Sequence, residues 1–502
     1  MKRLVLIILN LLILSAATAQ IPYELKNRWW EGYLAEAGLP LNISMQNALS
    51  DWSDINAEAA RSVASLLAQY SGMPSDSIIN DLTPVFYSPS QTKQPFPATD
   101  FSFANDTLRM VLGDLGVKMT LAYNRKDNTF AGTFRQGMMK TDITFTPCDT
   151  LSSFNRPQTP QPPYSFIGEQ VTIRRKDKND NEIVITGTLA IPTCPAPTKG
   201  GYPAAVLVSG SGQQNRDSEL FLHKPFLVWA EELAKQGIAT LRYDDRGTGG
   251  STGDYTKATS YDYADDAEAV FDFLRKHEKI DAKHCGIVGH SEGGMIAPLV
   301  AARNKKVTFV VMLAGPGCKG SEVLYQQNEV LIRNQVEDPT LRAIALGCSR
   351  ELFDVVPNTS EDAMSSTVME ILARHTRDIS KEQARSLGLH KGNAIMLAQQ
   401  YNLPWMKTFM QIDPSVYLPK VKCPIMAVNG EKDSQVLSEP NIKAIQEHAT
   451  SCPRLVCKTY PKLNHLFQEC ETGLSKEYIF IEQSVAPQVM DDVAKFIHST
   501  HK

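Results

Sequence analysis

The chain has 502 residues, of which 42% are hydrophobic and 21% are charged, and its formal net charge is −4. This length and composition are typical of a folded protein with more than one domain, and they exclude a largely disordered chain. Because 51 basic and 55 acidic side chains nearly balance, the charge gives no reason to expect nucleic acid or an anionic membrane as a partner.

The first twenty residues have the pattern of a secretory signal peptide. Lys2 and Arg3 supply positive charge, Leu4–Leu14 form an apolar run, and Ala17–Ala19 provide the small residues of a cleavage site. The apolar run is too short to cross a bilayer comfortably, so no stable membrane anchor is expected. We therefore predict that residues 1–19 are a cleavable signal peptide and that the protein is secreted or periplasmic.

Nine cysteines are scattered along the chain, at positions 148, 194, 285, 318, 348, 423, 452, 457 and 470. Export permits disulfides, but the odd number leaves at least one free thiol. No pair has the spacing of metal ligands, since Cys452 and Cys457 lack a second pair or nearby histidines. We expect mainly buried small hydrophobic side chains with one or two bridges, and no metal site.

Residues 20–150 are predicted to form a β-rich domain. Ala57–Tyr70 is an exception, since its many alanines and leucines predict a helix. A linker is predicted at residues 151–163, where Arg156–Pro163 contain four prolines in eight residues, which favours a stiff, extended segment rather than a packed one. The short, partly alternating segments that predict strands are Leu108–Leu112, Lys118–Tyr123, Thr129–Arg135 and Thr141–Thr146.

Residues 164–502 alternate between strand and helix patterns, which predicts a mostly parallel sheet with helices on both faces. Helices are expected at Pro225–Gln236, Asp262–Lys276 and Met295–Ala302. Between about residues 318 and 420 the pattern is helical throughout, which predicts an insertion that lies over the carboxyl edge of the sheet as a lid. The expected strands are Val171–Arg175, Ile183–Ile191, Ala204–Ser209, Ile238–Tyr243, Gly286–Val288, Val307–Leu313, Ile425–Asn429 and Leu455–Tyr460.

The segment Gly289–Gly293, with the sequence Gly-His-Ser-Glu-Gly, lies between a predicted strand and a predicted helix. This is the context of a nucleophile elbow, a turn so tight that side chains next to the serine would clash. Ser291 is therefore the predicted nucleophile.

A serine hydroxyl needs a base to take its proton, and in this arrangement an acid and then a histidine follow the nucleophile in the chain. Asp433 follows the strand Ile425–Asn429, and His465 follows the strand Leu455–Tyr460, so both are expected on loops at the carboxyl edge. Glu431 is the rival acid, but it lies closer to the end of its strand. The rival histidines, none of which follows a late strand, are His223, His290, His448, His498 and His501.

An oxyanion hole needs two backbone N–H donors that point at the developing negative charge. One is expected from Glu292, the residue after the nucleophile, and the other from Ser211, with Gly212 as the alternative. Two glycine-rich stretches, Gly210–Gly212 and Gly247–Gly250, lack the full pattern of a nucleotide-binding loop. The charged segment Arg242–Gly247 is interpreted as a rigid turn that supports the site.

Together these segments resemble bacterial α/β-hydrolases described as carboxylesterases with a serine-aminopeptidase-like hydrolase domain. Ser209 is a departure, since many such enzymes carry His at that place. The resemblance implies an α/β-hydrolase fold with a helical lid, preceded by a small β-rich module, and hydrolysis of short acyl esters without metal or organic cofactor. The matching segments are Trp30–Leu34 and Phe134–Gly137 in the module and Gly210–Gly212, Tyr243–Gly247, Gly289–Gly294, Asn429–Asp433 and Asn464–Phe467 in the catalytic domain.

The sequence thus predicts a serine hydrolase that cleaves small carboxylic esters with the triad Ser291, Asp433 and His465. An aminopeptidase or dipeptidyl peptidase with the same triad is the first alternative, and it would need carboxylates in the lid to bind a free amino terminus. Candidates for that role are Glu329, Glu337 and Asp338. A non-catalytic binding protein is the second alternative, which a complete triad argues against.

Overall fold

A computed structural model describes residues 21–26, 28–34, 39–47, 82–89, 91, 95–137, 139–149 and 155–500. The chain divides into two compact units, Met1–Asn155 and Arg156–Lys502. The predicted signal peptide and the predicted helix at residues 57–70 lie outside the described residues. Within the described residues, no helix has both the length and the apolar character that a membrane span requires.

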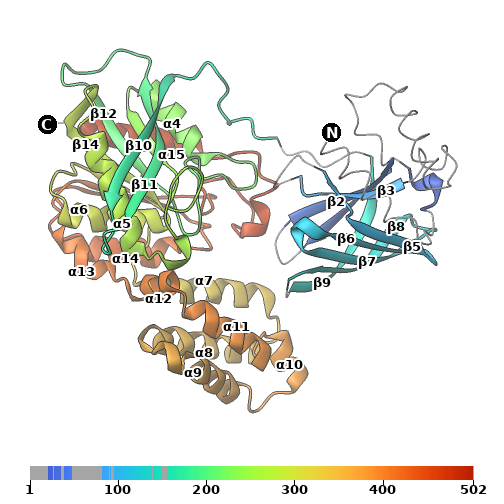
Figure 1. Cartoon of the computed structure of the whole chain (residues 1–502). Helices are drawn as coiled ribbons and strands as arrows, with labels where there is room; N and C mark the ends of the chain where they lie inside the picture. The colour runs from blue at the N-terminus through green and yellow to red at the C-terminus, as the bar shows by residue number, and fades with distance from the viewer. Residues whose placement is uncertain are drawn as a thin grey trace, which may run out of the picture. The chain divides into compact units, whose positions relative to one another are not determined.

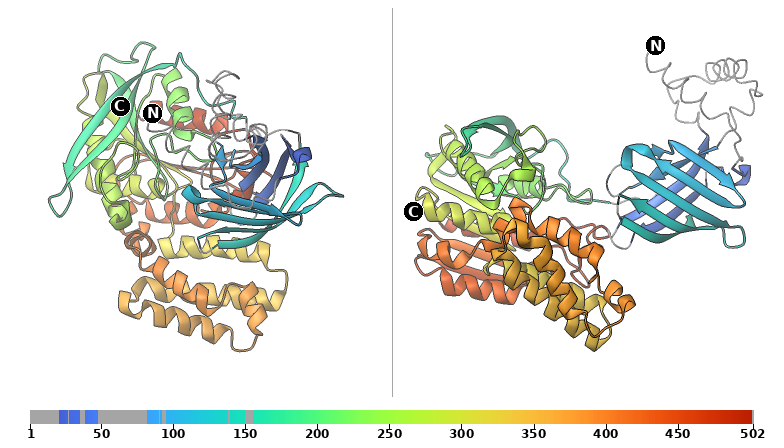
Figure 2. Two further views of the ribbon diagram at one scale, coloured as in Figure 1. Left: turned by 45° about the vertical axis from the view of Figure 1, so that its right-hand side comes forward. Right: turned by 60° about the horizontal axis from the view of Figure 1, so that its bottom comes forward.

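The first unit contains one curled antiparallel sheet, drawn in blue and teal in Figures 1 and 2. Its nine strands lie in the order β4-β3-β2-β1-β9-β8-β7-β6-β5. The bounds are β1 Trp29–Leu34, β2 Leu39–Asn47, β3 Leu82–Tyr87, β4 Phe96–Pro97, β5 Asp100–Ala104, β6 Thr107–Leu112, β7 Val117–Asn124, β8 Thr129–Gln136 and β9 Met139–Cys148. The predicted strands in this region are confirmed.

Alternation of apolar and polar residues explains why these segments form a sheet with one buried face. In β7, Val117, Met119 and Leu121 are buried while the residues between them are exposed. They join a core that also contains Trp30 and Phe145, both fully buried. An antiparallel sheet with one solvent-exposed face requires apolar and polar residues to alternate in this way, with a period of two.

The proline-rich segment after this unit is held on the second unit. Arg156 donates through Nη2 to the carbonyl of Ile479 at 2.7 Å and through Nε to that of Phe221 at 3.0 Å. Gln158 donates to the carbonyl of Val485 at 2.7 Å. The expectation that this segment is not packed is therefore wrong, because the polar side chains of Arg156 and Gln158, on either side of Pro157, donate to backbone carbonyls of the second unit.

The second unit is built on an eight-stranded sheet in the order β10-β11-β13-β12-β14-β15-β16-β17. The strand β11 is antiparallel to both of its neighbours, and the remaining pairs are parallel, which confirms the expected mostly parallel sheet. The bounds are β10 Phe166–Lys176, β11 Glu182–Pro192, β12 Tyr202–Val208, β13 Ala239–Tyr243, β14 Ile280–His290, β15 Val310–Leu313, β16 Ile425–Gly430 and β17 Leu455–Tyr460.

Helices cover both faces of this sheet (Figure 1). Two of them, α4 (Pro225–Lys235) and α15 (Pro487–Ser499), pack on one face with the core around Phe309. On the other face lie α5 (Ser260–Leu274), α6 (Glu292–Arg303) and α14 (Ser438–His448). Both faces of the central strands are therefore apolar. The residues of β12 after Tyr202 and all residues of β16 are buried, rather than every second residue.

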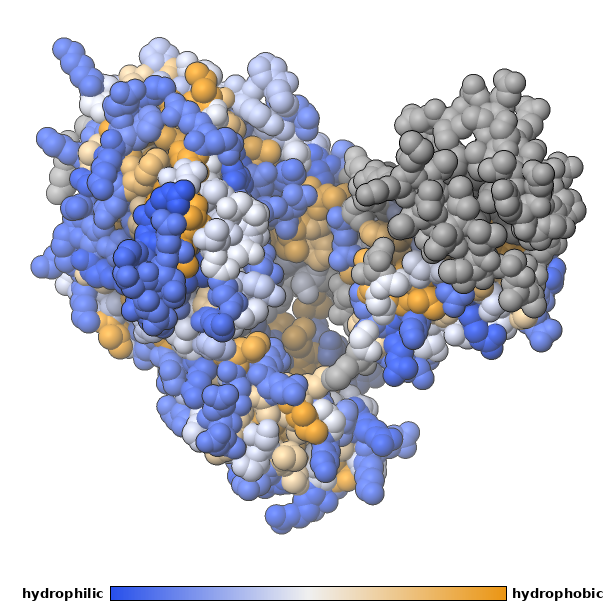
Figure 3. Space-filling view, viewed as in Figure 1, coloured by the Kyte–Doolittle hydropathy of each residue, from blue (hydrophilic) through white to orange (hydrophobic). Residues whose placement is uncertain are grey.

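The chain between β15 and β16 is helical, as predicted. The helices are α7 Gly320–Gln335, α8 Pro339–Val355, α9 Glu361–His375, α10 Lys381–Ser386, α11 Lys391–Tyr401, α12 Pro404–Gln411 and α13 Pro414–Tyr417. Most of them share a core of their own, which includes Leu352, Val368 and Met410. Figure 2 draws these helices in yellow and orange, gathered beside the sheet. Hydrophilic residues dominate the visible face of the second unit, with hydrophobic residues in small separate patches (Figure 3).

The order of the strands defines where a site can form. From β12 the chain crosses to β13 on one side and returns to β14 on the other side. Such a reversal opens a crevice at the carboxyl ends of the two diverging strands, which here are β12 and β14. The residues that follow these strands are the glycine-rich loop at Gly210 and the predicted nucleophile, Ser291.

All nine cysteines lie in the described part of the chain, and all are free thiols. The expectation of one or two bridges is therefore wrong. Cys285, Cys348 and Cys423 are buried, as expected for small hydrophobic side chains.

Candidate active site

Ser291 lies on the turn between β14 and α6. Its backbone has φ of 54° and ψ of −120°, a conformation that L-residues rarely adopt. The Ser291 N–H donates to the carbonyl of Leu313 on β15 at 2.8 Å, and its carbonyl accepts from the Gly294 N–H at 2.8 Å. These bonds hold the strained turn and keep the hydroxyl at the carboxyl edge of the sheet.

The glycines around Ser291 have a packing function. A Cβ atom at Gly289 would lie 1.9 Å from the carbonyl oxygen of Gly293, and one at Gly293 would lie 2.2 Å from that of Val208. A side chain at Gly289 would therefore force the turn itself open, and one at Gly293 would push the elbow away from β12. The predicted reason for the motif, steric exclusion next to the nucleophile, agrees with these distances.

Asp433 and His465 are in direct contact, although 32 positions separate them. His465 Nδ1 and Asp433 Oδ2 are 2.8 Å apart, and both residues are 3% exposed. The other carboxylate oxygen, Oδ1, accepts from the backbone N–H groups of Gln435 at 2.8 Å and Val436 at 2.9 Å. These bonds fix the carboxylate and leave Nε2 as the free ring nitrogen of His465. Glu431, the rival acid, is exposed.

The loops that carry the acid and the histidine are held together by their backbones. The Lys432 N–H donates to the carbonyl of Leu463 at 3.0 Å. A Cβ atom at Gly430 would lie 2.1 Å from that same carbonyl oxygen, so the approach requires glycine. His290 Nε2 bonds to the backbone carbonyl of His465 at 2.9 Å. Burial and the neighbouring His465 lower the pKa of His290 to about 3, so this rival histidine is neutral and supports the loop.

The glycine-rich loop after β12 lies against the nucleophile. A Cβ atom at Gly210 would be 3.1 Å from the Cβ of Ser291, and Ser211 lines the same cavity as Ser291. Glu292 is the first residue of α6, and the first backbone N–H groups of a helix have no partner within the helix. The two residues predicted to supply oxyanion donors therefore lie next to the nucleophile, Ser211 in the glycine-rich loop and Glu292 at the start of α6.

Ser209 has a partner that the sequence did not reveal. Its hydroxyl is 3.0 Å from both carboxylate oxygens of Asp245, and the Gln214 N–H donates to the same carboxylate at 3.1 Å. Burial raises the pKa of Asp245 to about 8. Both ends of the glycine-rich loop are thus fastened to one buried carboxyl group, which follows β13.

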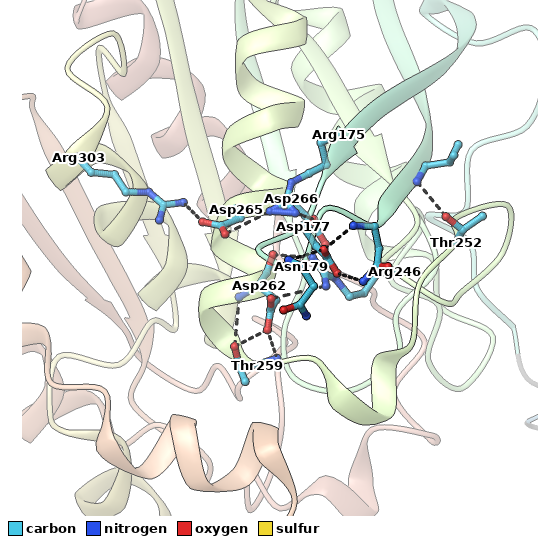
Figure 4. A network of polar contacts seen from close by, with 12 residues as sticks. Arg175, Asp177, Asn179, Arg246, Thr252, Thr259, Asp262, Asp265, Asp266 and Arg303 are labelled. Carbon is cyan, nitrogen blue, oxygen red and sulfur yellow. Dashed lines mark hydrogen bonds and ion pairs between the residues drawn. The ribbon is translucent and has the colours of Figure 1, made fainter.

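The charged turn at the end of β13, within Arg242–Gly247, is anchored to α5 by a buried ion pair (Figure 4). Arg246 donates through Nε and Nη2 to the two carboxylate oxygens of Asp266 on α5, each at 2.7 Å. Arg175 lies 3.4 Å from the same carboxylate. Bidentate pairing of this kind fixes direction as well as distance, which agrees with the interpretation of Arg242–Gly247 as a supporting turn.

The side chain of Glu292 is a buried polar group that sequence reasoning missed. It is 2% exposed, and its Oε1 accepts from the Ser260 hydroxyl at 2.6 Å. The indole N–H of Trp405, on α12, lies 3.0 Å from each of its carboxylate oxygens. The only sign of this buried group in the sequence is a charged residue, Glu292, within the predicted nucleophile elbow.

Ser291 and His465 line one cavity of about 340 Å³. Among the described residues that line it there is no Asp, Glu, Lys or Arg. The polar side chains there include Gln214, Ser218, Gln327 and Gln435, and the apolar walls come largely from α4, α7 and α12, through Phe226, Trp229, Val323, Leu324, Trp405 and Phe409.

The acidic residues considered for binding an amino terminus do not line this cavity. Glu329 pairs with Arg333 at 2.6 Å on the surface of α7. Asp338 caps α8 by accepting from the N–H groups of Thr340 and Leu341. Both have structural partners, so these interactions explain why an acid occupies each position.

Comparison with known proteins finds similarities for the second unit. Residues 226–471 match the family described as "Serine aminopeptidase, S33". The chain is similar to the esterase EstD of Thermotoga maritima, with 27% identity over 232 residues, which are 46% of this chain and 49% of that protein. It is also similar to an uncharacterized 31.7 kDa protein of Escherichia coli, from the traX-finO intergenic region, with 23% identity over 208 residues, covering 41% of this chain and 66% of that one. The match thus spans about half of EstD.

Solved structures that match this chain include an esterase of Pyrococcus furiosus. It has 15% identity and a TM-score of 0.38, and the match covers 70% of this chain and 99% of that one. A hypothetical protein of Pseudomonas aeruginosa has 16% identity and a TM-score of 0.42, and the match covers 70% of this chain and 100% of that one. The family match, the strand order and the elbow agree. The second unit has the α/β-hydrolase fold, and its residues 226–471 match the serine aminopeptidase S33 family model.

Proposed function

We propose that this protein hydrolyses small carboxylic esters by acyl transfer to Ser291. His465 takes the proton of the Ser291 hydroxyl as its oxygen attacks the ester carbonyl, and Asp433 holds the imidazole in the required tautomer. The backbone N–H groups of Ser211 and Glu292 stabilise the oxyanion. His465 then protonates the leaving alcohol, and a water molecule activated by the same histidine releases the acid. This chemistry needs no metal or organic cofactor.

The observation that carries the choice of substrate is the absence of charged side chains among the described residues of the cavity wall. A peptidase that binds a free amino terminus needs a carboxylate near it, because an ammonium group loses its hydration on binding. Neutral groups and aromatic walls suit an uncharged ester instead. This argument favours the esterase over the aminopeptidase and dipeptidyl peptidase alternatives.

The size of the cavity supports a preference for short acyl chains. A volume of about 340 Å³ lies near the lower end of the range for small-molecule sites, roughly 300–1,000 Å³. Acyl and alcohol groups must share this space. The N-terminal pattern of charged, apolar and small residues supports a secreted or periplasmic location for the enzyme.

The test is turnover of p-nitrophenyl esters of increasing acyl length, beside aminoacyl and dipeptidyl p-nitroanilides. We expect rapid cleavage of the acetyl and butyryl esters, a decline for longer chains, no cleavage of the anilides, and loss of activity in Ser291→Ala. Cleavage of the anilides with a free amino terminus would overturn the ester assignment. Failure to cleave any ester or anilide would favour a binding protein.

A further inference from the structure

The carboxylate of Glu292 connects three parts of the second unit that are distant in sequence. Ser260 begins α5, Trp405 lies on α12 of the helical insertion, and Glu292 itself begins α6 directly after the nucleophile. The side chain of Ser211, in the glycine-rich loop, also lies close enough to this carboxylate to lower its pKa. The side chains that act on the Glu292 carboxylate therefore include one from the loop that supplies the other proposed oxyanion donor.

Ser260 and Trp405 each donate a hydrogen bond to this carboxylate. A buried carboxylate is costly unless donors satisfy its oxygens, and here the indole N–H of Trp405 and the hydroxyl of Ser260 do so. Burial raises the pKa of Glu292, and the side chains of Ser260, Ser211 and Trp405 oppose that change. A glutamine in this place would keep one acceptor oxygen but would turn an amide NH₂ toward a donor.

Trp405 has two contacts with different consequences. Its ring lines the cavity that Ser291 and His465 also line, and its N–H is shared between the two carboxylate oxygens of Glu292, each at 3.0 Å. One side chain of the insertion therefore touches both the place of the substrate and the residue whose backbone N–H faces the oxyanion.

We propose that Glu292 is a positioning residue, and that its hydrogen bond with Trp405 couples the helical insertion to the oxyanion hole. With α12 in place, the carboxylate holds the start of α6 and the Ser211 loop in the geometry that the transition state needs. The bond acts through position alone, and no proton or electron is transferred along it. This inference rests on the proposed esterase function.

The experiment compares Trp405→Phe, Glu292→Gln and the double variant with the wild-type enzyme on p-nitrophenyl acetate. Phenylalanine keeps an aromatic ring and loses the N–H. We expect each single variant to lower kcat about tenfold, because full loss of an oxyanion donor costs about 10²–10³ in turnover and a displaced donor costs less. KM for this small ester should change less than threefold. The double variant should be no slower than the slower single variant, because both changes break the same bond.

Met406→Leu is the matched control. Met406 neighbours Trp405 on α12, packs into the core of the insertion and does not line the cavity. A swap of similar volume there should leave kcat and KM unchanged. A second readout is inhibition by a trifluoromethyl ketone, which forms a tetrahedral oxyanion on the serine. Its Ki should rise in Trp405→Phe and Glu292→Gln by the same factor by which kcat/KM falls.

The outcomes separate this inference from the function on which it rests. A wild-type protein that cleaves no ester would overturn the proposed function. An active wild type with unchanged kcat and Ki in a folded Trp405→Phe would overturn the coupling alone. Losses that multiply in the double variant would also overturn it. If Trp405→Phe has a lowered Tm, the decision falls to Glu292→Gln, where an unchanged kcat and Ki would contradict the proposal.

Discussion

The Nδ1 atom of His465 lies 2.8 Å from Oδ2 of Asp433, while the other oxygen of that carboxylate is occupied by two backbone N–H groups. The imidazole can therefore bond to Asp433 only as the tautomer that carries its proton on Nδ1. In that tautomer Nε2 is a base. In the proposed mechanism, this pair decides which ring nitrogen of His465 takes the proton of Ser291.

Replacement of Asp433 by asparagine should remove the base without removing the fold. An amide NH₂ at the place of Oδ2 would favour the opposite tautomer of His465. We expect kcat to fall about 10⁴-fold on p-nitrophenyl acetate, with little change in KM. Glu431→Gln, at the exposed rival acid, is the control and should retain wild-type turnover. Equal losses in the two variants would be incompatible with the assigned acid.

The tight approach of the elbow to β12 predicts the effect of a single methyl group. In Gly293→Ala the new Cβ would overlap the carbonyl oxygen of Val208, so we expect a loss of about 3 kcal/mol or more in the free energy of unfolding. Gly392→Ala, on α11, meets no atom closer than 3.4 Å and should stabilise by about 0.5–1 kcal/mol. Thermal unfolding measures both, and similar Tm values for the two variants would contradict the packing argument.

Asp245 should give the stability of the second unit a distinctive pH dependence. Its pKa is about 8 in the folded protein and 3.8 ordinarily, so between these values the folded state holds a proton that the unfolded chain releases. The free energy of unfolding therefore falls as pH rises through this window, with a slope of at most about 1.4 kcal/mol per pH unit from this group.

Asp245→Asn removes this titration, so the decline should be shallower in the variant. The measurement is urea unfolding of both proteins from pH 5 to pH 8, followed by circular dichroism of the helical signal, because every α-helix of the described residues lies in the second unit. If the free energies of unfolding of the two proteins change in parallel with pH across the whole range, Asp245 does not hold the extra proton.

Because the cysteines are unpaired, the structure predicts how many thiols will react with a thiol reagent. Denatured without reductant, the protein should react with nine equivalents of Ellman's reagent, because all nine thiols are unpaired. A sample reduced beforehand and freed of reductant should give the same number. Seven or five reactive thiols in the untreated sample would mean that the chain forms one or two bridges after all.

Much of the second unit could be predicted from the sequence because the patterns that define its strands and helices lie within short segments of the chain. Continuous apolar runs such as Ala204–Ser209 are buried on both faces, and they are typical of central parallel strands. The contact between Asp433 and His465 follows from the same logic, since residues after parallel strands meet at one edge of the sheet. Helix α5 begins two residues earlier than predicted, at Ser260, because Thr259 and Asp262 form a capping box.

The contacts that escaped prediction join residues far apart in the chain. Glu292 and Trp405 are 113 positions apart, and no spacing rule brings a helix of the insertion to the elbow. Ser209 and Asp245 belong to loops after two different strands, so only the register of β12 with β13 places them together. Arg156 and Gln158 likewise reach the carbonyls of Ile479 and Val485, each more than 300 positions away, which a count of prolines does not reveal.

The central claim is that Ser291 is an activated nucleophile, and covalent labelling tests it most directly. The protein is treated with a fluorophosphonate, digested, and the adduct is located by mass spectrometry. We predict one adduct per chain, on Ser291, that is absent in Ser291→Ala and forms far more slowly in Asp433→Asn. An adduct on a different residue, or an ester-cleaving protein that takes up no label at Ser291, would contradict the account.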